Sequence, residues 1–483
     1  MSESGSQAYQ DLHRPSSEFP TREAYLEHEL QIMSPRRWKV NLPGRDYRFE
    51  FEDWVPAMAA TIGKIVMTAA VAGAFAAQLG LGSDFVIENA RYELLIVVLF
   101  VVLASGLMVP TANLAGTHGP MIPLIPIVLL GGGHPMAFGI LVGVLGLGLG
   151  LLKGGSLMAK LTSNGVCGGL LLYLGFIGTI GQVNKLFDWA DGFDMGYIAF
   201  IVVFATIVMY AYLEHVRLRW LAIPLGCTMA AGIAFALGAP FEFVTEPGIP
   251  HLSPSYWWGE DTGWKLGLPD LGSFLAVAPF AILAVAMWSP DFLGHRVFQE
   301  LNYPKKTDKV LMNIDDTMRV AGVRQFVGSF LGGGNLTSSW GTYLVPAAIA
   351  KRPIPAGAVL TGLLCLLAAI IGYPMDLAVW PPVLSVALLV GVYVPLLEAG
   401  MQMTREGKTS QSAAVVVLSS ALVNPAFGWS LTMLLDNLGL IGDKERGQEM
   451  DHVHRWVIPL FMFLLLTGIL ALVGQIPGVP ALI

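Results

Sequence analysis

Two short stretches identify the architecture of this chain: NLAGTHG at residues 113–119 and NLTSSWG at residues 335–341. Each starts with Asn-Leu, ends with an imidazole or aromatic residue followed by glycine, and runs into an apolar stretch that contains proline. Glycine and proline at these places disfavour a continuous helix. The second stretch lies 222 residues after the first, and a proline-marked turn and a glycine-rich apolar segment follow both. We infer an internal repeat in which each copy has one interrupted helix.

The composition places most of the chain in a membrane. Of its 483 residues, 54% are hydrophobic and 13% are charged, whereas soluble domains carry about 25% charged residues. A soluble multidomain enzyme is therefore excluded. The apolar segments are about 17–25 residues long, which is the length of a transmembrane helix. The three cysteines (Cys167, Cys227 and Cys365) lie in apolar stretches, so we interpret them as core residues without a disulfide framework or a metal-binding spacing.

We count about fourteen apolar segments and call them spans 1 to 14 in chain order. They cover residues 55–79, 92–107, 109–130, 135–153, 164–182, 195–212, 220–237, 271–298, 320–331, 334–350, 356–371, 381–403, 412–440 and 457–473. Spans 3 and 10 contain the two interrupted stretches, seven spans apart. Because seven is odd, the second copy is inverted in the membrane, as in inverted-repeat transporters. The predicted fold is an all-α polytopic membrane protein with two inverted repeats of seven spans.

The chain divides into four predicted parts. A cytoplasmic N-terminal segment covers residues 1–52, the first repeat (spans 1–7) covers 53–239, a tryptophan-rich extracytoplasmic loop covers 240–270, and the second repeat (spans 8–14) covers 271–476. Lys and Arg are concentrated before span 1 and after most even-numbered spans, and this positive-inside bias predicts that both termini are cytoplasmic. We expect a multi-pass protein of the cytoplasmic (inner) membrane.

The two broken spans have a physical role in this arrangement. Non-helical backbone at membrane depth is tolerated only where it is buried in protein or lines a watery cavity. Each broken span is predicted to run as an extended stretch into a half-helix. Two half-helix N-termini that face each other near the membrane midplane offer N–H groups and positive dipole ends, which favour an anion or an electronegative ligand. The alternative is that both stretches are kinks in ordinary helices.

The residues of spans 8 to 10 resemble a known superfamily. The run PDFLGHRVFQELNYPKK, which starts at Pro290, and the two broken spans look like the nucleobase/ascorbate transporters and their relatives, the sulfate permeases and the bicarbonate/anion exchangers. The resemblance implies that spans 1–4 and 8–11 form a core domain and that spans 5–7 and 12–14 form a gate domain. It also implies that the core moves as a body against the gate and that the gate forms a homodimer.

Asp291 and His295 are candidate functional residues in span 8. They are four residues apart, so they lie on one face of a helix, and ionisable residues within a span indicate function by default. The resemblance implies that Asp291 stands at an acidic position that binds substrate or takes part in cation coupling. For Asp291 the alternatives are a structural salt bridge or a helix end at Ser289-Pro290; for His295 the alternative is a hydrogen-bonded packing residue.

Lys64 is an intramembrane cation in span 1. It lies about ten residues from the polar flank, which is too deep for its ammonium to reach water easily, and burial without a partner costs a few kcal/mol. We expect Asp291 to be its partner. Lys64 then forms a salt bridge alone, supplies positive charge to an anionic substrate, or alternates with a coupling cation for Asp291.

The broken spans supply the remaining candidate residues. The resemblance implies that His118 and Trp340, at equivalent positions of the repeat, stack on the ligand. Thr342 stands where nucleobase transporters carry a second glutamate, and this departure favours an anion over a heterocycle with N–H edges. The full predicted substrate-binding set is Lys64, Thr117, His118, Asp291, His295, Ser338, Ser339, Trp340, Gly341 and Thr342.

The sequence predicts a secondary active transporter of a small anion such as sulfate, bicarbonate or a carboxylate. Its coupling ion would be H⁺ or Na⁺, with Asp291 as the coupling residue. Its partners would be the anion and the lipid bilayer. A uracil- or xanthine-like nucleobase symporter and a passive anion channel are the alternatives. We expect no enzymatic activity, no cofactor beyond the coupling ion, no metal site and no nucleic-acid partner, because no catalytic constellation or Walker motif is present.

Overall fold

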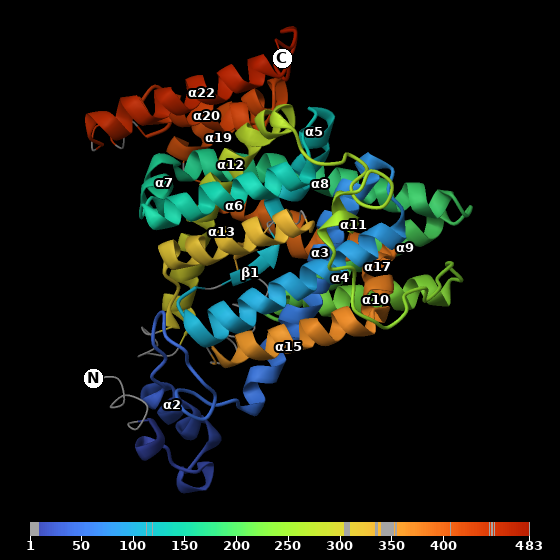
Figure 1. Ribbon diagram of the computed structural model, residues 1–483, viewed down its shortest axis with the longest axis vertical. Coiled ribbons are helices and arrows are strands. Elements are labelled where there is room, and N and C mark those ends of the chain that lie inside the picture. Colours follow the sequence, from blue (N-terminus) through green and yellow to red (C-terminus); the bar gives the residue numbers. More distant parts are fainter. Residues whose placement is uncertain are drawn as a thin grey trace.

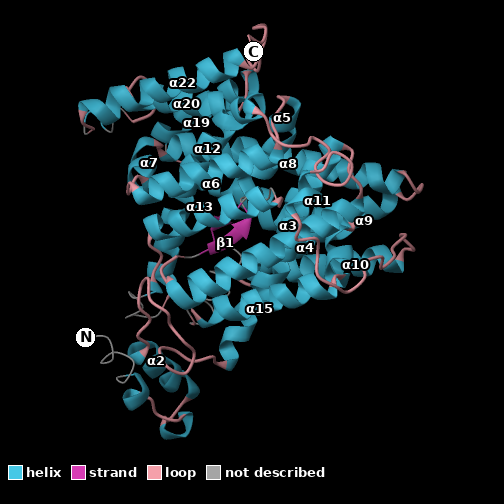
Figure 2. Cartoon of the chain, viewed as in Figure 1, coloured by secondary structure: helices cyan, strands magenta, loops and turns pink. Residues whose placement is uncertain are grey.

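The computed structural model describes residues 9–112, 114–117, 119–303, 310–333, 337–339, 352, 355–405, 407–443, 445, 448 and 450–482. Figure 2 shows a molecule made almost entirely of helices, with strand β1 near its middle. The only sheet among the described residues is the two-stranded pair of β1 and β2. The predicted all-helical membrane fold is therefore confirmed, apart from this small sheet.

The elements of the first half follow the predicted spans 1 to 7. They are η1 (Ser16–Glu18), α2 (Arg22–Ile32), η2 (Phe51–Asp53), α3 (Trp54–Leu79), α4 (Ser83–Leu99), the π-helix η3 (Phe100–Met108), β1 (Leu114–Thr117), η4 (Gly119–Leu124), α5 (Ile125–Leu130), α6 (Pro135–Leu151), α7 (Gly155–Leu161), α8 (Asn164–Asp191), α9 (Gly196–His215), η5 (Arg219–Leu221) and α10 (Ala222–Ala236).

The elements of the second half begin in the tryptophan-rich loop. They are α11 (Pro254–Trp258), α12 (Leu271–Asn302), α13 (Ile314–Leu331), β2 (Thr337–Ser339), α15 (Ala356–Ile371), α16 (Tyr373–Val379), α17 (Pro381–Leu388), η7 (Leu389–Tyr393), α18 (Val394–Met403), α19 (Gly407–Leu422), α20 (Pro425–Asn437), η8 (Val453–Val457) and α22 (Ile458–Leu472).

The chain is a multi-pass membrane protein. Within the described residues, eight helices are long and apolar enough to cross a bilayer, and a ninth results if α15 and α16 form one broken span. The helices of predicted spans 3 and 4, at 119–130 and 135–151, are apolar but shorter. The count of fourteen spans stays a prediction.

One span differs in shape from the prediction. Residues 412–440 were predicted as one span, but α19 and α20 are separate helices that pack against each other. The break occurs because Asn424 caps α20, accepting a hydrogen bond from the Phe427 amide, and Pro425 starts the new helix. Span 11 has its predicted bounds: α15 ends at Ile371, and Gly372, whose φ is 80°, lets α16 leave α15 at 90°.

The helices are arranged along the long axis of the molecule. In Figure 1, α19, α20 and α22 lie toward one end, α6, α12 and α13 come next, α3, α4 and α15 follow, and α2 of the N-terminal segment lies at the other end. Close packing of α6 on α13 depends on small residues: a Cβ at Gly143 would lie 2.5 Å from the Phe326 amide nitrogen, and one at Gly322 would lie 2.4 Å from the Leu147 amide nitrogen. Glycine at such positions lets two helix backbones approach closely.

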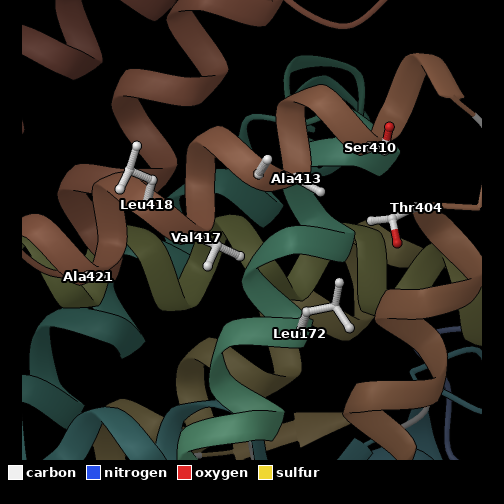
Figure 3. Close-up of a pocket in the computed structure, with 8 residues that line it drawn as sticks. Leu172, Thr404, Ser410, Ala413, Val417, Leu418 and Ala421 are labelled. Atoms are coloured by element: carbon white, nitrogen blue, oxygen red, sulfur yellow. The ribbon is translucent and has the colours of Figure 1, made fainter.

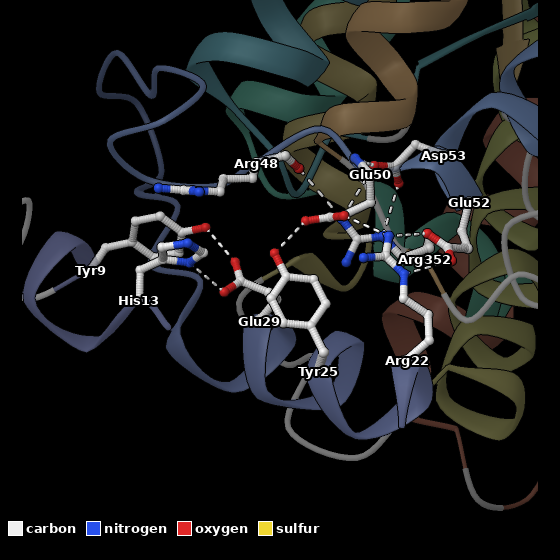
Figure 4. A network of polar contacts seen from close by, with 10 residues as sticks. All are labelled: Tyr9, His13, Arg22, Tyr25, Glu29, Arg48, Glu50, Glu52, Asp53 and Arg352. Atoms are coloured by element: carbon white, nitrogen blue, oxygen red, sulfur yellow. Dashed lines mark hydrogen bonds and ion pairs between the residues drawn. The ribbon is translucent and has the colours of Figure 1, made fainter. Parts of the chain in front are cut away.

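The N-terminal segment is folded and has its own polar network (Figure 4). The buried Glu29 carboxylate accepts a hydrogen bond from the Tyr9 hydroxyl at 2.6 Å and lies 2.7 Å from Nδ1 of His13. Burial raises the pKa of Tyr9, and its bond to Glu29 adds to the rise. Beside this cluster, Arg22 forms ion pairs with Glu50 and with a neighbouring glutamate. The segment therefore holds its own shape at the end of the molecule.

Two charged contacts join the N-terminal segment to the helices behind it. Arg37 binds both carboxylate oxygens of Asp316, near the start of α13. Asp53 binds Arg352, with 3.0 Å between Oδ1 and Nε and 3.2 Å between Oδ2 and Nη2 (Figure 4). The segment is thus part of the membrane protein's framework.

Candidate functional site

The two interrupted stretches meet in the middle of the molecule. β1 and β2 pair in antiparallel orientation, with Leu114 opposite Ser339 and Thr117 opposite Thr337. The predicted site residues Thr117, Ser338 and Ser339 therefore lie on neighbouring strands, although they are more than 200 residues apart in the chain. The prediction of an extended stretch is confirmed for both segments, and span 3 continues into a half-helix as predicted. The half-helix predicted after the second stretch lies outside the described residues, so the facing of two half-helix N-termini stays a prediction.

Four predicted site residues, His118, Trp340, Gly341 and Thr342, lie outside the described residues. The half-helix that follows β1 is described. It comprises η4 and α5 and runs over residues 119–130. The first amide groups of a helix have no acceptor within it, and its dipole is positive at that end. A Cβ at Gly119 would lie 3.0 Å from Cγ1 of Val392 in η7, so the half-helix starts in direct contact with the helix of span 12.

Asp291 and His295 lie together on α12, as predicted from their spacing. The distance from Oδ1 of Asp291 to Nε2 of His295 is 3.8 Å, and the side chains are 33% and 23% exposed. α12 continues through Pro290 without a break. The alternative that Asp291 stands at a helix end is therefore wrong.

Lys64 is buried, with 2% of its surface exposed. It lies on α3, which packs on α15 and α4. No salt bridge between Lys64 and Asp291 is found in the described part of the chain; Asp291 instead lies beside His295. The predicted Lys64–Asp291 pair is wrong because α12 packs on α6 and α13, whereas α3 packs on α4 and α15.

A buried ion pair between Glu93 of α4 and Arg324 of α13 was missed in the sequence. The side chains are 0% and 2% exposed, and Nη2 of Arg324 donates to Oε2 of Glu93. Nη1 of Arg324 also donates to Gln325 at 2.9 Å, and Gln325 donates to Ser329 at 3.0 Å. Arg324 lies inside predicted span 9 and Glu93 one residue inside predicted span 2, so the rule that charged residues within a span indicate function points to both members, although neither was among the predicted site residues.

These residues come from the helices that surround the strand pair. α3, which carries Lys64, packs on β1; α13, which carries Arg324, packs on both strands; α12, which carries Asp291, packs on β2. The helices that pack on the strand pair thus carry, among other charged residues, Lys64, Arg324 and Asp291, and Arg324 is paired with Glu93 of α4. Such a site can attract an anion through its cations and can hold a proton or a metal cation at a carboxylate.

Other places in the described residues fit a charged ligand less well. No group of three or more His, Cys, Asp or Glu residues there could hold a metal ion. A hollow between α8 and α19 is shown in Figure 3. It is lined by Leu172, Thr404, Ser410, Ala413, Ala414, Val417, Leu418 and Ala421. This lining contains no charged side chain, so the hollow is suited to apolar groups and not to an anion.

The fold is similar to that of solved anion transporters. The transmembrane domain of a cyanobacterium bicarbonate transporter, BicA, is 17% identical, with a TM-score of 0.53, over 80% of this chain and 97% of that one. Murine Slc26a9, titled as an anion transporter in the inward-facing state, is 12% identical, with a TM-score of 0.54, over 89% and 74% of the two chains. A second SLC26A9 structure is 14% identical, with a TM-score of 0.50, over 81% and 66%. The resemblance noted in the sequence is thus confirmed for the fold.

The sequence comparisons are less specific. No curated protein matches this chain. A family described as "Protein of unknown function (DUF3360)" matches residues 1–483. Because this match covers the whole sequence, the chain belongs to the DUF3360 family.

Proposed function

We propose that this protein is a secondary active transporter of a small anion in the cytoplasmic membrane, with both termini on the cytoplasmic side. The observation that carries the proposal is the antiparallel pairing of β1 with β2, because two interrupted membrane segments meet there. Non-helical backbone at membrane depth occurs only where it is buried in protein or lines a watery cavity. In inverted-repeat transporters, substrate sites lie between such interrupted segments.

The charges around the strand pair support an anionic substrate. Lys64 and Arg324 lie in helices that pack on these strands, and Thr342 stands where a nucleobase site would need a carboxylate. BicA is a bicarbonate transporter and Slc26a9 an anion transporter by title. Bicarbonate, sulfate and small carboxylates are therefore the substrates to test first, with a nucleobase as the alternative.

The packing supports movement of a core against a gate. In a first group of helices, α6 packs extensively on α13 and α12, and α15 packs on α3 and α4. In a second group, α8 packs on α18 and α19, and α10 packs on α9 and α17. The first group corresponds to spans 1–4 and 8–11, and the second to spans 5–7 and 12–14. The half-helix at Gly119 touches Val392 across the boundary, so a substrate at the strand pair is covered or exposed when the two groups slide.

Asp291 is the proposed coupling residue. A carboxylate that is one third exposed and 3.8 Å from an imidazole can take up H⁺ or Na⁺ from water. We also propose a homodimer through the gate helices, in keeping with the resemblance.

The test is uptake by the purified chain in liposomes. Labelled bicarbonate, sulfate, acetate and uracil are offered with an inward H⁺ gradient, with an inward Na⁺ gradient, and with neither. The proposal expects accumulation of at least one anion only with a gradient, and Asp291→Asn should abolish that accumulation while leaving thermal unfolding unchanged. Anion flux that merely equilibrates would favour a channel. Uptake of uracil with inert anions would favour a nucleobase symporter.

A further inference from the structure

The outer loop (residues 240–270) is packed into the membrane part, contrary to its polar composition. Trp257 and Trp264 are 0% and 1% exposed. The Trp264 ring lies 4.8 Å from the Phe85 ring and 5.7 Å from the Phe75 ring, centroid to centroid. The Trp257 ring lies 5.2 Å from that of Tyr92. These contacts place two large rings against α3 and α4.

The loop also binds the turn between α13 and β2. The indole N–H of Trp264 donates to the Gly332 carbonyl at 2.9 Å. The Asn89 amide, from α4, donates to the next carbonyl, that of Gly333, at 2.8 Å. Two consecutive backbone acceptors at the entrance to broken span 10 are thus held by two side chains that are otherwise far apart in the chain. β2 begins four residues later, at Thr337.

Both glycines are needed for this fit. Gly332 has φ of +124°, and a Cβ there would lie 2.1 Å from the Cβ of Trp257. A Cβ at Gly333 would lie 2.2 Å from Oε1 of Glu93. The turn is therefore packed between the outer loop on one side and the Glu93–Arg324 pair on the other. A displacement of the loop moves the turn, and with it β2 and the buried charge pair.

We propose that Trp264 and Asn89 are positioning residues for the anion site. By binding the Gly332 and Gly333 carbonyls, they fix the position of β2 relative to β1. The proposal rests on the proposed function for its effect on anions. Its structural part, that these two donors hold the strand pair, does not depend on transport.

The experiment compares three variants of the full chain. Trp264→Phe keeps a ring against Phe75 and Phe85 but removes the N–H donor, and Asn89→Leu removes the second donor. Trp258→Phe is the matched control, because its ring packs on Phe330 at 5.4 Å while its indole nitrogen has no acceptor among the described residues. Two quantities are measured: hydrogen exchange of the amides in β1 and β2, and the half-saturating bicarbonate and sulfate concentrations in liposomes.

The expected result is faster exchange of the β1 and β2 amides, by about tenfold, in Trp264→Phe and Asn89→Leu but not in Trp258→Phe. For whichever anion is transported, the half-saturating concentration should rise about tenfold with a similar maximal rate. Unchanged exchange in both donor variants overturns the proposal. So does a lower maximal rate at an unchanged half-saturating concentration, because that pattern reports fewer folded molecules. If the wild type transports neither anion, the proposed function fails, and the exchange measurement still decides the positioning role.

Discussion

Glu93→Gln tests whether the buried pair with Arg324 is an electrostatic element of the site. The substitution keeps an acceptor for the guanidinium but removes the negative charge. Both side chains are at most 2% exposed, so water cannot replace the lost carboxylate. Breaking a buried pair by removing one partner costs about 3–5 kcal/mol, since the other charge stays buried. We expect a loss of that size in the free energy of unfolding.

The matched control is Glu300→Gln. Glu300 pairs with Arg296 one turn away on α12 at 2.6 Å, but their side chains are 48% and 34% exposed. Exposed pairs contribute about 0–1 kcal/mol. The free energy of unfolding is measured by titration with a denaturing detergent in mixed micelles, monitored by tryptophan fluorescence. If the two substitutions cost the same, the argument from burial is refuted.

A double variant separates stability from transport. Glu93→Gln with Arg324→Gln removes both charges, so most of the lost stability should return, because neither charge stays buried alone. The half-saturating anion concentration should stay above that of the wild type, because Arg324 no longer contributes positive charge near the strand pair. Wild-type anion affinity in a stable double variant would show that the pair serves packing alone.

Three further predictions concern single side chains. Burial lowers the pKa of His134 to about 4, against about 6.5 in the unfolded chain. The free energy of unfolding should therefore be highest above pH 6.5 and fall by about 1.4 kcal/mol per pH unit toward pH 4. Denaturation curves of His134→Gln, recorded over the same pH range, should lose that slope. Lys64→Met should raise the half-saturating anion concentration about tenfold without lowering the melting temperature, whereas an unchanged value would exclude a role in substrate binding. Arg352→Gln leaves Asp53 buried without its guanidinium, so trypsin should release the N-terminal segment faster than from Lys408→Gln, which breaks an exposed pair.

The broken spans could be predicted from sequence because their cause is local. Glycine, proline and small polar residues interrupt a helix wherever they occur together, and the repeat of this pattern indicated that the interruptions are related. The spacing of Asp291 and His295 was also sufficient, since residues four apart share a helical face. In each case the information lies within a few neighbouring residues.

The partners of buried charges could not be predicted in the same way. The position of Lys64 in span 1 showed that it would be buried, but nothing near Glu93 in the sequence showed that Arg324, in another span, would be its partner. Glu93 lies one residue inside its span, and near a span end composition alone cannot separate a flanking charge from a buried one. The burial of Trp257 was missed for a similar reason, because the surrounding loop is polar. Long-range packing decides these contacts, and one sequence does not record it.

At both entrances to the strand pair, backbone carbonyls accept hydrogen bonds, but the donors come from different parts of the chain. At the entrance to span 3, the side-chain amide of Asn41, in the N-terminal segment, donates to the Leu107 carbonyl. The backbone N–H of Asn313 donates to the Thr111 carbonyl. At the entrance to span 10, Trp264 and Asn89 bind two consecutive glycine carbonyls. Backbone carbonyls where a helix ends need donors when water is excluded. The N-terminal segment thus supplies one donor at the entrance to span 3, and the loop of residues 240–270 supplies one at the entrance to span 10. Both interrupted segments are therefore held by hydrogen bonds at their entrances, next to the point where they pair.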